Sequence, residues 1–499
     1  MKLSLLAILM LSAMTTHATQ YFVDSLGLDT QVGTKALPFA TIARAQTAAV
    51  AGDTIYIRGG TYTYTTTTST CALQTSVVSS IVLSKNGSAG KTIKYWAYPG
   101  ETPIFDFYGV SADCRIKGFF VSGSYIHMKG LEIRGVPQNN SLNHENWGVW
   151  ISGSYNTFEL LNLHHNMGPG LFIQKGSNNL VLNCDSHHNY DQFTSNGAGE
   201  SADGFGAHIS AGDTGNVFRG CRAWWNTDDG FDLINAFAPV TIENCWAWYN
   251  GYLPGTFTTG SNGNGIKAGG YGTDTLTFPT SAVVHTVRFC LSFLNRSAGF
   301  YANHHPFTVN FYNNTGYGNH PNFNMLGMTI HGVDTTVGVY KNNLAYSGTN
   351  LTNYSFSHTE VTNSWNLTAS VTISDADFGS VSLTGTDGPR QSDGSLPLLT
   401  YMHLVASSDA INKGTNLGFT YVGTAPDLGA FEYGTSSSNI MSSSSIALSS
   451  SSTVSSSSAI VASSSSTPVS TQWQNHPGHY TNPVPVYDLL GRVRIPYLL

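Results

Sequence analysis

The sequence predicts an all-β solenoid, a fold in which short strands stack in successive coils along one axis. The first observation behind this prediction is an asparagine that closes the same short pattern repeatedly. It occurs at Asn166, Asn189, Asn226, Asn250, Asn295 and Asn319. The intervals are 23, 37, 24, 45 and 24 residues, and the short ones match the length of one solenoid coil. The two long intervals fit the same coil with insertions at 190–202 and 251–264, which we expect to wall a binding groove.

Alternation with a period of two is the second observation. Each coil has a glycine at an equivalent position: Gly148, Gly170, Gly204, Gly230, Gly265 and Gly299. One and three residues further on, the side chains are apolar or small, which indicates that they point inward. The residue between them points outward, and this column comprises Trp150, Phe172, Gly206, Asp232, Lys267 and Tyr301. Asp232 and Lys267 are therefore predicted to be neighbours on adjacent strands, about 4.8 Å apart at the backbone.

The composition is the third observation, and it also limits the partners. Charged residues make up 10% of the chain, and its 52 glycines suit an all-β protein with many turns. A formal net charge of −7 argues against nucleic acid as a partner. A polyanionic partner would have to be held by local cations or by a metal ion.

The first 18 residues have the character of a secretory signal peptide. Lys2 precedes an apolar run at 3–14, and the segment 16–18 leads to Thr19. This run is too short to span a membrane, and no later run is long enough. We therefore expect an exported monomer without a membrane span, either secreted or held at the cell surface by its C-terminal tail.

The mature chain divides by composition into three parts. Residues 19–434 are assigned to the solenoid, and a segment at 41–50 with helical spacing is predicted to be a short helix that caps its N-terminal end. Residues 435–470 are dominated by serine, which predicts a flexible linker. Residues 471–499 form a short tail that resembles part of a sorting or anchoring module.

Most of the cysteines are interpreted as structural. Four of them share one repeat position, five residues before the recurring asparagine: Cys184, Cys221, Cys245 and Cys290. We predict a column of small buried side chains, because neither C-x-x-C pairs nor suitably spaced histidines accompany them. Cys71 and Cys114 stand outside this column, and a disulfide between them fits an oxidising compartment.

The recurring asparagines are also assigned to structure. Stacked inside a coil, their side chains can hydrogen-bond along the stack and to the backbone of the turns, as an asparagine ladder. Two histidine pairs, at 164–165 and 187–188, lie in or beside the same pattern. We favour a structural role for these histidines over a metal site.

Four aspartates and a lysine gather on neighbouring coils: Asp203, Asp228, Asp229, Asp232 and Lys267. Asp203 and Asp229 each lie one residue before the coil's glycine, so they stack, with Asp228 beside them. Grouped carboxylates repel one another unless something neutralises them, and Ca2+ is a hard cation that prefers oxygen ligands. The alternative is a solvated acidic edge or a purely structural Ca2+ clamp, neither of which needs the lysine.

The segment 215–235, which reads GNVFRGCRAWWNTDDGFDLIN, resembles pectate lyases of polysaccharide lyase family nine. The resemblance continues through 240–244 and 263–267 and covers about residues 21 to 433. It implies a right-handed parallel β-helix that uses Ca2+ and a lysine base. By resemblance, Asp203, Asp228, Asp229 and Asp232 match the Ca2+ ligands, and Lys267 matches the proton acceptor.

The substrate implied by the resemblance is a (1→4)-linked galacturonan, as in polygalacturonate or pectin. Ca2+ on the uronate carboxylate would make the proton on C5 more acidic, and a neutral Lys267 would remove it. Loss of the glycosidic oxygen from C4 would then give a 4,5-unsaturated oligogalacturonate. A free lysine has a pKa of about 10.4, which leads us to expect an alkaline optimum.

Three arginines are candidates for contacts with further substrate carboxylates: Arg222, Arg288 and Arg296. A guanidinium pairs with a carboxylate through two hydrogen bonds, but these arginines could equally cap turns or pair with surface acids. We prefer Arg296, which lies in the coil just after Lys267. The outward aromatic residues Trp150, Phe172 and Tyr301 could stack on sugars or pack under a loop.

Other functions fit parts of the same pattern. A polygalacturonase-like hydrolase would use paired carboxylates as acid and base without a metal, which leaves the lysine unexplained. A non-catalytic solenoid would bind pectin and release nothing. A lyase for another uronate-containing polysaccharide would use the same site.

Overall fold

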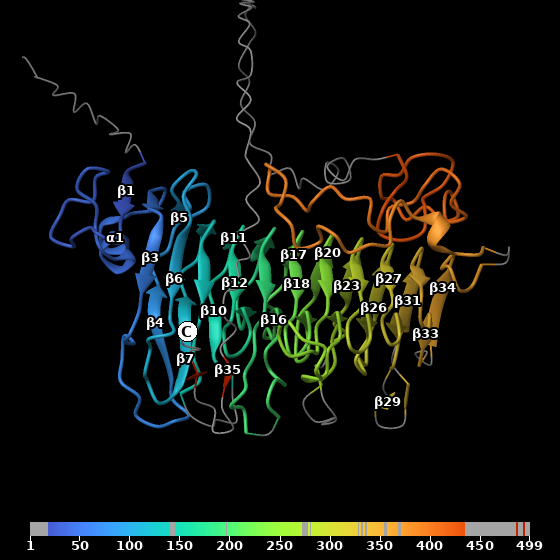
Figure 1. Cartoon of the computed structure of the whole chain (residues 1–499), viewed down its shortest axis with the longest axis horizontal. Helices are drawn as coiled ribbons and strands as arrows, with labels where there is room; N and C mark the ends of the chain where they lie inside the picture. Colours follow the sequence, from blue (N-terminus) through green and yellow to red (C-terminus); the bar gives the residue numbers. More distant parts are fainter. Residues whose placement is uncertain are drawn as a thin grey trace, which may run out of the picture. The chain divides into compact units, whose positions relative to one another are not determined.

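The computed structural model is a right-handed parallel β-helix, which confirms the predicted fold class (Figure 1). Three long parallel sheets, here named A, B and C, form its walls. Each complete coil contributes one strand to each sheet, so strands that are neighbours in a sheet come from successive coils. The structure describes residues 18–139, 145–195, 197–271, 278–279, 281–327, 329–330, 333–334, 337–353, 357–367, 371–434, 486–487 and 493–494.

Sheet A has 12 strands and begins with the first strand of the mature chain. Its order follows the sequence, because each coil lays its strand beside that of the previous coil. The strands are β1 (Gln20–Val23), β2 (Thr54–Ile57), β5 (Ile93–Ala97), β8 (Ile126–Lys129), β11 (Thr157–Glu159), β14 (Leu180–Leu182), β17 (Asn216–Arg219), β20 (Val240–Glu243), β23 (His285–Arg288), β26 (Val309–Tyr312), β31 (Val337–Lys341) and β34 (Ser357–Val361).

Sheet B has 10 strands, each following a strand of sheet A after a short turn. A left-handed residue such as Leu160 or Asn183 makes this turn between the two sheets. The strands are β3 (Gly60–Thr63), β6 (Pro103–Asp106), β9 (Glu132–Arg134), β12 (Asn162–His164), β15 (Asp185–His187), β18 (Arg222–Trp224), β21 (Trp246–Trp248), β24 (Leu291–Phe293), β27 (Thr315–Tyr317) and β32 (Leu344–Tyr346).

Sheet C also has 10 strands and contains the glycine-led strands of the sequence pattern. The strands are β4 (Val77–Leu83), β7 (Arg115–Val121), β10 (Trp147–Ile151), β13 (Leu171–Ile173), β16 (Phe205–Ala207), β19 (Phe231–Asp232), β22 (Ile266–Lys267), β25 (Phe300–Tyr301), β28 (Phe323–Asn324) and β33 (Leu351–Thr352). A separate antiparallel pair, β29 (Thr329–Ile330) and β30 (Val333–Asp334), lies between β28 and β31 in the sequence.

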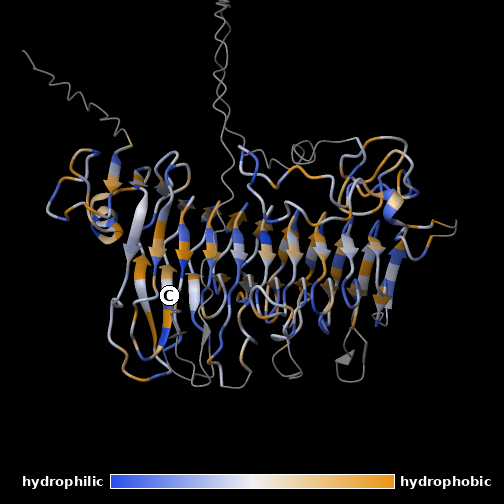
Figure 2. Cartoon of the chain, viewed as in Figure 1, coloured by the Kyte–Doolittle hydropathy of each residue, from blue (hydrophilic) through white to orange (hydrophobic). Residues whose placement is uncertain are grey.

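The core lies inside the coil, where alternate residues of all three sheets meet. Hydrophobic and hydrophilic residues alternate along the strands in Figure 2, as the period of two predicts. Phe205, Phe231, Phe300 and their neighbours on other strands are fully buried in it. The four cysteines of the repeat column are also completely buried, which agrees with their interpretation as small core side chains.

The asparagine ladder is present as predicted. The side-chain amide of Asn189 donates to Oδ1 of Asn226 at 2.8 Å, and Asn226 donates to Asn250 at 3.0 Å. The same nitrogen of Asn226 also donates to the backbone carbonyl of Ser186. The buried amide of Asn226 is thus bound to the asparagine of the next coil and to the backbone of the preceding coil, which fixes the register of the coils.

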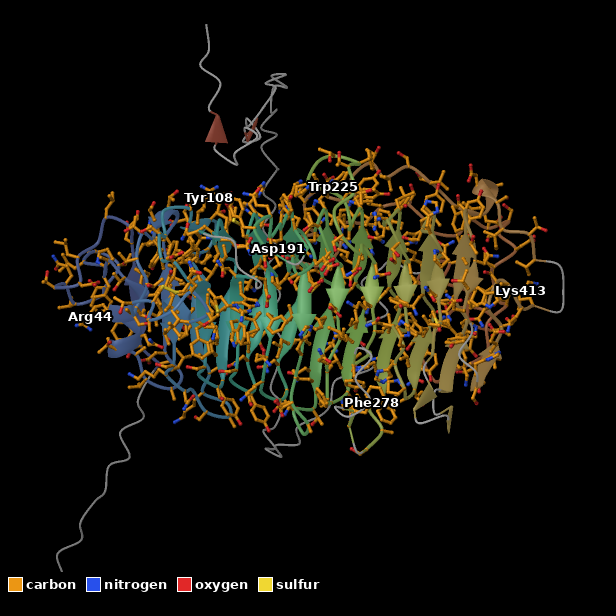
Figure 3. All side chains as sticks on the ribbon, turned by 90° about the horizontal axis from the view of Figure 1, so that it is seen from below. Arg44, Tyr108, Asp191, Trp225, Phe278 and Lys413 are labelled. Carbon is orange, nitrogen blue, oxygen red and sulfur yellow. A yellow bond between two sulfur atoms is a disulfide. The ribbon has the colours of Figure 1, made fainter. Side chains whose placement is uncertain are left out.

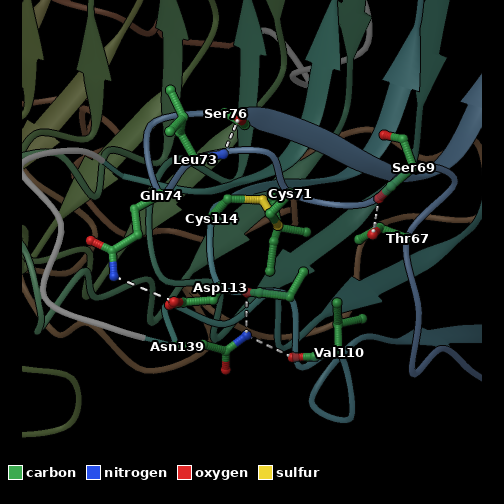
Figure 4. Close-up of a disulfide and its surroundings, with 12 residues drawn as sticks. Thr67, Ser69, Cys71, Leu73, Gln74, Ser76, Val110, Asp113, Cys114 and Asn139 are labelled. Atoms are coloured by element: carbon green, nitrogen blue, oxygen red, sulfur yellow. Dashed lines mark hydrogen bonds between the residues drawn. A yellow bond between two sulfur atoms is a disulfide. The ribbon is translucent and has the colours of Figure 1, made fainter.

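Both structural expectations at the N-terminal end are confirmed. Helix α1 (Ile42–Ala48) is capped by Thr41, whose hydroxyl accepts a hydrogen bond from the backbone N–H of Arg44 at 3.1 Å. The helix lies at one end of the solenoid, and Figure 3 shows Arg44 there and Lys413 at the other end. Cys71 and Cys114 form a disulfide (Figure 4).

A long segment at 371–434 covers the outer face of sheet B. It contains a single 3-10 turn, η1 (Asp375–Asp377), and otherwise follows an irregular path. Its buried residues Phe378, Tyr401 and Leu404 pack with Trp248 and Phe293 in a second hydrophobic cluster outside the coil. Sheet B is therefore buried on both faces in this part of the molecule.

The chain divides into two units between Ser444 and Ser445. In the second unit the structure describes β35 (Val486–Tyr487) and β36 (Val493–Arg494), which pair antiparallel. The predicted signal peptide and the serine-rich linker fall outside the described residues, apart from Ala18, and so does most of the tail. In the part of the chain that the structure describes, no helix has the length and apolar character needed to cross a bilayer.

Candidate active site

The outward column of sheet C has the predicted register. Gly206 pairs with Asp232, Asp232 with Lys267, and Lys267 with Tyr301 on successive strands. A glycine precedes each of these strands because a side chain there would collide with the next coil. A Cβ at Gly230, for example, would lie 2.5 Å from the backbone oxygen of Gly265. The stacking of coils therefore brings together residues 35 positions apart in the sequence.

Lys267 lies between two carboxylates. Its Nζ is 3.1 Å from Oδ2 of Asp232 and 3.2 Å from Oδ2 of Asp229. Asp232 and Lys267 were expected on an outward face, yet Lys267 is only 8% exposed and Asp232 only 4%. The side chains face outward from the coil but are buried among one another, so the lysine is held in a pocket of low dielectric.

The other two aspartates complete the acidic cluster. Oδ1 of Asp203 accepts a hydrogen bond from the backbone N–H of Asp229 at 3.1 Å, as expected for stacked turns. Carboxylate oxygens of Asp203, Asp229 and Asp232 lie within 4.8 Å of one another. Asp228 is next to this triad in the chain, and its buried Oδ1 has no hydrogen-bond partner among the described residues.

These residues fit a hard divalent cation. The cluster contains four carboxylates and one ammonium, so it has a large excess of negative charge in a buried place. Its donors are all oxygens, which Ca2+ prefers, and the unpartnered oxygen of Asp228 is free to act as a ligand. The structure thus supplies both the charge and the donor set for the predicted metal site.

Burial and crowding shift the pKa values of the cluster in different directions. Burial raises the pKa of Asp203, and the charge of Asp232 adds to the effect. Burial and Asp229 likewise raise the pKa of Asp228. Burial opposes the charge of Asp232, but Lys267, His208 and the backbone N–H of Ile234 together outweigh it and lower the pKa of this aspartate to about 2. Burial alone would lower the pKa of Lys267, but the carboxylates around it raise it well above the ordinary value.

Both predicted insertions reach this site. The loop at 190–202 precedes β16, and the loop at 251–264 precedes β22. Gly199 of the first loop and Gly260 of the second both lie against Thr227. A Cβ built at either glycine would come within about 3.2 Å of this threonine. Ser261 of the second loop also donates its backbone N–H to the carbonyl of Thr227 at 2.8 Å. Both loops therefore border the turn that carries Asp228 and Asp229.

Two residues of the site were missed from the sequence. Asn264 donates its backbone N–H and its side-chain amide to Oδ1 of Asp229, at 2.6 and 2.8 Å. His208 places Nε2 at 3.8 Å from Oδ2 of Asp232. His208 is two residues after Gly206, so extending the outward column by one more alternate position would have revealed it.

The structure does not bring Arg222 to this site, and the prediction that it contacts substrate is wrong. Arg222 lies on β18 in sheet B and is only 3% exposed. It donates to both oxygens of Asp185, at 2.7 and 2.8 Å, and to the carbonyls of Thr386 and Gly388. The covering segment at 371–434 buries it, and the sequence pattern gave no sign of that cover.

The other two arginines also have protein partners. Arg288 lies on sheet A and pairs with the buried Glu243, so its guanidinium has a partner away from the site. Arg296 donates from Nη1 to the carbonyl of Ser261 at 2.6 Å, so it holds the loop at 251–264. Arg296 is thus close to a wall of the site, and its contact with substrate stays a prediction.

The solenoid carries a buried acidic cluster that contains Lys267, and the comparisons with known proteins identify the chain as a polysaccharide lyase. Residues 21–358 match the family model described as "Pel9A-like, right handed beta helix region". The chain belongs to this family.

Named relatives cover most of the chain. It is 34% identical over 419 residues to pectate lyase L of Dickeya chrysanthemi, covering 83% of this chain and 90% of that protein. It is 32% identical over 402 residues to pectate lyase PEL9 of Emericella nidulans, covering 76% of this chain and 90% of that protein.

Two solved structures are also similar. Pectate lyase Pel9A superposes with a TM-score of 0.68 at 33% identity, covering 83% of this chain and 96% of that one. A structure described as rhamnogalacturonan lyase has a TM-score of 0.70 at 35% identity, covering 78% of this chain and 97% of that one. Both share the fold over most of the solenoid.

Proposed function

We propose that the chain is a Ca2+-dependent pectate lyase that cleaves (1→4)-α-D-galacturonan by β-elimination. The observation that carries the proposal is the buried contact of Lys267 with Asp229 and Asp232 inside a cluster of excess negative charge. The named pectate lyase relatives support the choice of substrate. A hydrolase or a non-catalytic binding solenoid fits the site less well, because neither accounts for the lysine.

Each residue of the site has a separate role in the proposed reaction. Asp203, Asp228, Asp229 and Asp232 would hold the ion, which when bound supplies positive charge at the uronate carboxylate. The charge of a bound ion would oppose the effect of the carboxylates and favour the neutral amine of Lys267. The neutral amine would then accept the proton from C5 of the sugar, the C–H electron pair would form the C4–C5 double bond, and the C4–O bond would break to give a 4,5-unsaturated end. Asn264 fixes the orientation of Asp229 through its two hydrogen bonds. Arg296 binds a further uronate carboxylate at the edge of the site.

A second substrate is favoured by one specific finding. The similar solved structure described as rhamnogalacturonan lyase is 35% identical, about as close as the pectate lyase structure. The chemistry at Lys267 needs a uronate carboxylate beside an acidic C–H, and rhamnogalacturonan also supplies uronates. We retain it as the alternative polymer for the same site.

The test is product formation from purified protein with each of the two polymers. We expect polygalacturonate to give an ultraviolet-absorbing unsaturated product that disappears with chelator and returns with added Ca2+. New reducing ends without the unsaturated product would indicate a hydrolase instead. Product from rhamnogalacturonan alone would change the substrate and leave the lyase chemistry intact.

The site of action follows from the substrate and the leader sequence. The segment at 1–18 has the character of a secretory signal peptide, and the proposed polymer is extracellular. We propose that the enzyme is exported as a monomer. A fusion of the leader to a reporter tests this, and retention of the reporter inside the cell would contradict it.

A further inference from the structure

The outward column of sheet C continues past the acidic pocket toward the N-terminal end. From Lys267 on β22 it passes through Asp232 on β19 and Gly206 on β16. It then reaches three aromatic side chains in register on the next three strands, Phe172, Trp150 and Phe120. One face of the solenoid thus carries an aromatic strip that starts where the acidic pocket ends.

Gly206 makes the strip continuous with the pocket. The ring of Phe172 occupies the space where a side chain at Gly206 would lie, because a Cβ there would be 2.7 Å from Cδ2 of Phe172. The ring therefore packs against β16. The same ring contacts the imidazole of His208, with ring centroids 4.7 Å apart. His208 in turn faces Asp232, with 3.8 Å between Nε2 and Oδ2. The first aromatic ring therefore borders the acidic pocket directly.

A cation without an acidic partner lies at the far end of the strip. Nζ of Lys117 on β7 is 4.0 Å from the ring centroid of Trp150 and 4.2 Å from that of Phe120. Among the described residues, no carboxylate oxygen lies within 4.0 Å of this Nζ. The nearby Arg115 has its own partner, Glu145, at 3.1 Å. Lys117 thus has two aromatic contacts but no acidic partner among the described residues, and burial lowers its pKa to about 8.

A polyuronate matches this arrangement in both of its chemical features. The C–H face of a sugar ring packs on an aromatic face such as that of the half-buried Trp150, and the uronate carboxylate pairs with an ammonium. Five strand steps separate β22 from β7, which corresponds to about 24 Å along the solenoid. This distance spans several sugars of an extended chain.

We propose that β7, β10 and β13 form a distal subsite, in which Trp150 stacks on a sugar ring and Lys117 pairs with a uronate carboxylate. Phe172 forms the wall that joins this subsite to the pocket. The inference rests on the proposed function, because it takes the polyuronate as the ligand. It adds a length preference, since oligomers too short to reach Lys117 from Lys267 gain nothing from the subsite.

The experiment measures binding by calorimetry in the catalytically inactive Lys267→Ala protein with Ca2+ present, using galacturonate trimers and octamers. Lys117→Met should weaken binding of the octamer about tenfold and leave the trimer unchanged. Trp150→Leu should have the same length-dependent effect. The matched control is Lys94→Met, because Lys94 lies 4.8 Å over the ring of Trp96 on sheet A, away from the strip.

The possible results separate the subsite from the proposed function. Equal affinities of the Lys117→Met and parent proteins for the octamer would overturn the subsite, while lyase activity of the wild type would still support the function. A loss that is the same for trimer and octamer would also overturn it. If no oligogalacturonate binds and the wild type gives no unsaturated product, the proposed function fails and the subsite fails with it.

Discussion

Two buried charged clusters lie on different sheets of the same solenoid and differ in how their charges are balanced. On sheet B, Asp185 accepts hydrogen bonds from Arg222 and Arg390, and Arg222 also donates to two backbone carbonyls. On sheet C, Lys267 is the one lysine or arginine among the described residues that pairs with the four-carboxylate cluster. The first cluster has a partner for each of its charges, whereas the second has an excess of negative charge.

The pKa values of the aspartates reflect this difference. Burial opposes ionisation of Asp185, but hydrogen bonds from Arg222 and the charge of Arg390 keep its pKa below the ordinary value. Burial and like charges instead raise the pKa values of Asp203 and Asp228. Satisfied buried charges are typical of structural ion pairs, and buried charges left unbalanced mark candidate functional sites. The comparison therefore favours a stabilising role for the sheet B cluster and supports the proposed catalytic role of the sheet C cluster.

The largest expected effect is that of Lys267→Ala on turnover. Because this removes the proposed base, the rate on polygalacturonate should fall about 100- to 10,000-fold while the protein stays folded. Steady-state kinetics and circular dichroism measure the two quantities. The control is Lys129→Ala, which removes a lysine paired with Glu159 at 2.7 Å on sheet A and should keep normal activity. Near-normal turnover by Lys267→Ala would show that another group is the base.

Arg222→Ala should affect stability instead of catalysis. It leaves Asp185 with one fewer partner and two backbone carbonyls without a donor, so unfolding should become easier by about 3 kcal/mol. The midpoint of urea denaturation measures the loss, and KM for polygalacturonate should not change. A raised KM with unchanged stability would contradict this expectation and show that Arg222 contacts the substrate.

Asp228→Asn should have opposite effects with and without Ca2+. In the absence of the ion it removes one of several buried carboxylates that repel one another, so the variant should have a higher melting temperature than the wild type. With Ca2+, the variant should show a smaller rise in melting temperature than the wild type, because a ligand is lost. The contrasting variant is Asp185→Asn, which should destabilise the protein in both buffers. Equal Ca2+-induced shifts in Asp228→Asn and wild type would remove Asp228 from the ligand set.

The smallest effect is expected for Arg296→Ala. Loss of its hydrogen bond to Ser261 should loosen the loop at 251–264 and cost about 1 kcal/mol of stability. Loss of a substrate contact should also raise KM for polygalacturonate by a few-fold, on the scale of one exposed ion pair. Initial rates at several substrate concentrations separate KM from kcat. A change in stability with no change in KM would confine Arg296 to holding the loop.

Periodicity made much of the solenoid and its pocket predictable from the sequence. The register of Gly206, Asp232, Lys267 and Tyr301 follows from counting alternate residues after a glycine, since coils of constant shape stack each position on its equivalent. The asparagine ladder and the cysteine column follow in the same way. These features are set by interactions between neighbouring coils, which the repeat itself encodes.

Contacts that break the repeat could not be predicted in this way. Arg222 occupies an outward position of its strand, but a segment 164 residues later in the sequence covers it and binds its guanidinium. The contacts that Arg296 makes with the loop at 251–264 likewise depend on the path of an insertion. Such irregular segments have no period, and so the repeat does not indicate which outward side chains they bury.

The most direct test of the central claim is formation of unsaturated product from polygalacturonate by wild-type and Lys267→Ala proteins, each with Ca2+ and with chelator. We predict product only from the wild type with Ca2+. Product from the wild type in the presence of chelator, or from Lys267→Ala with Ca2+ at the wild-type rate, would contradict the account.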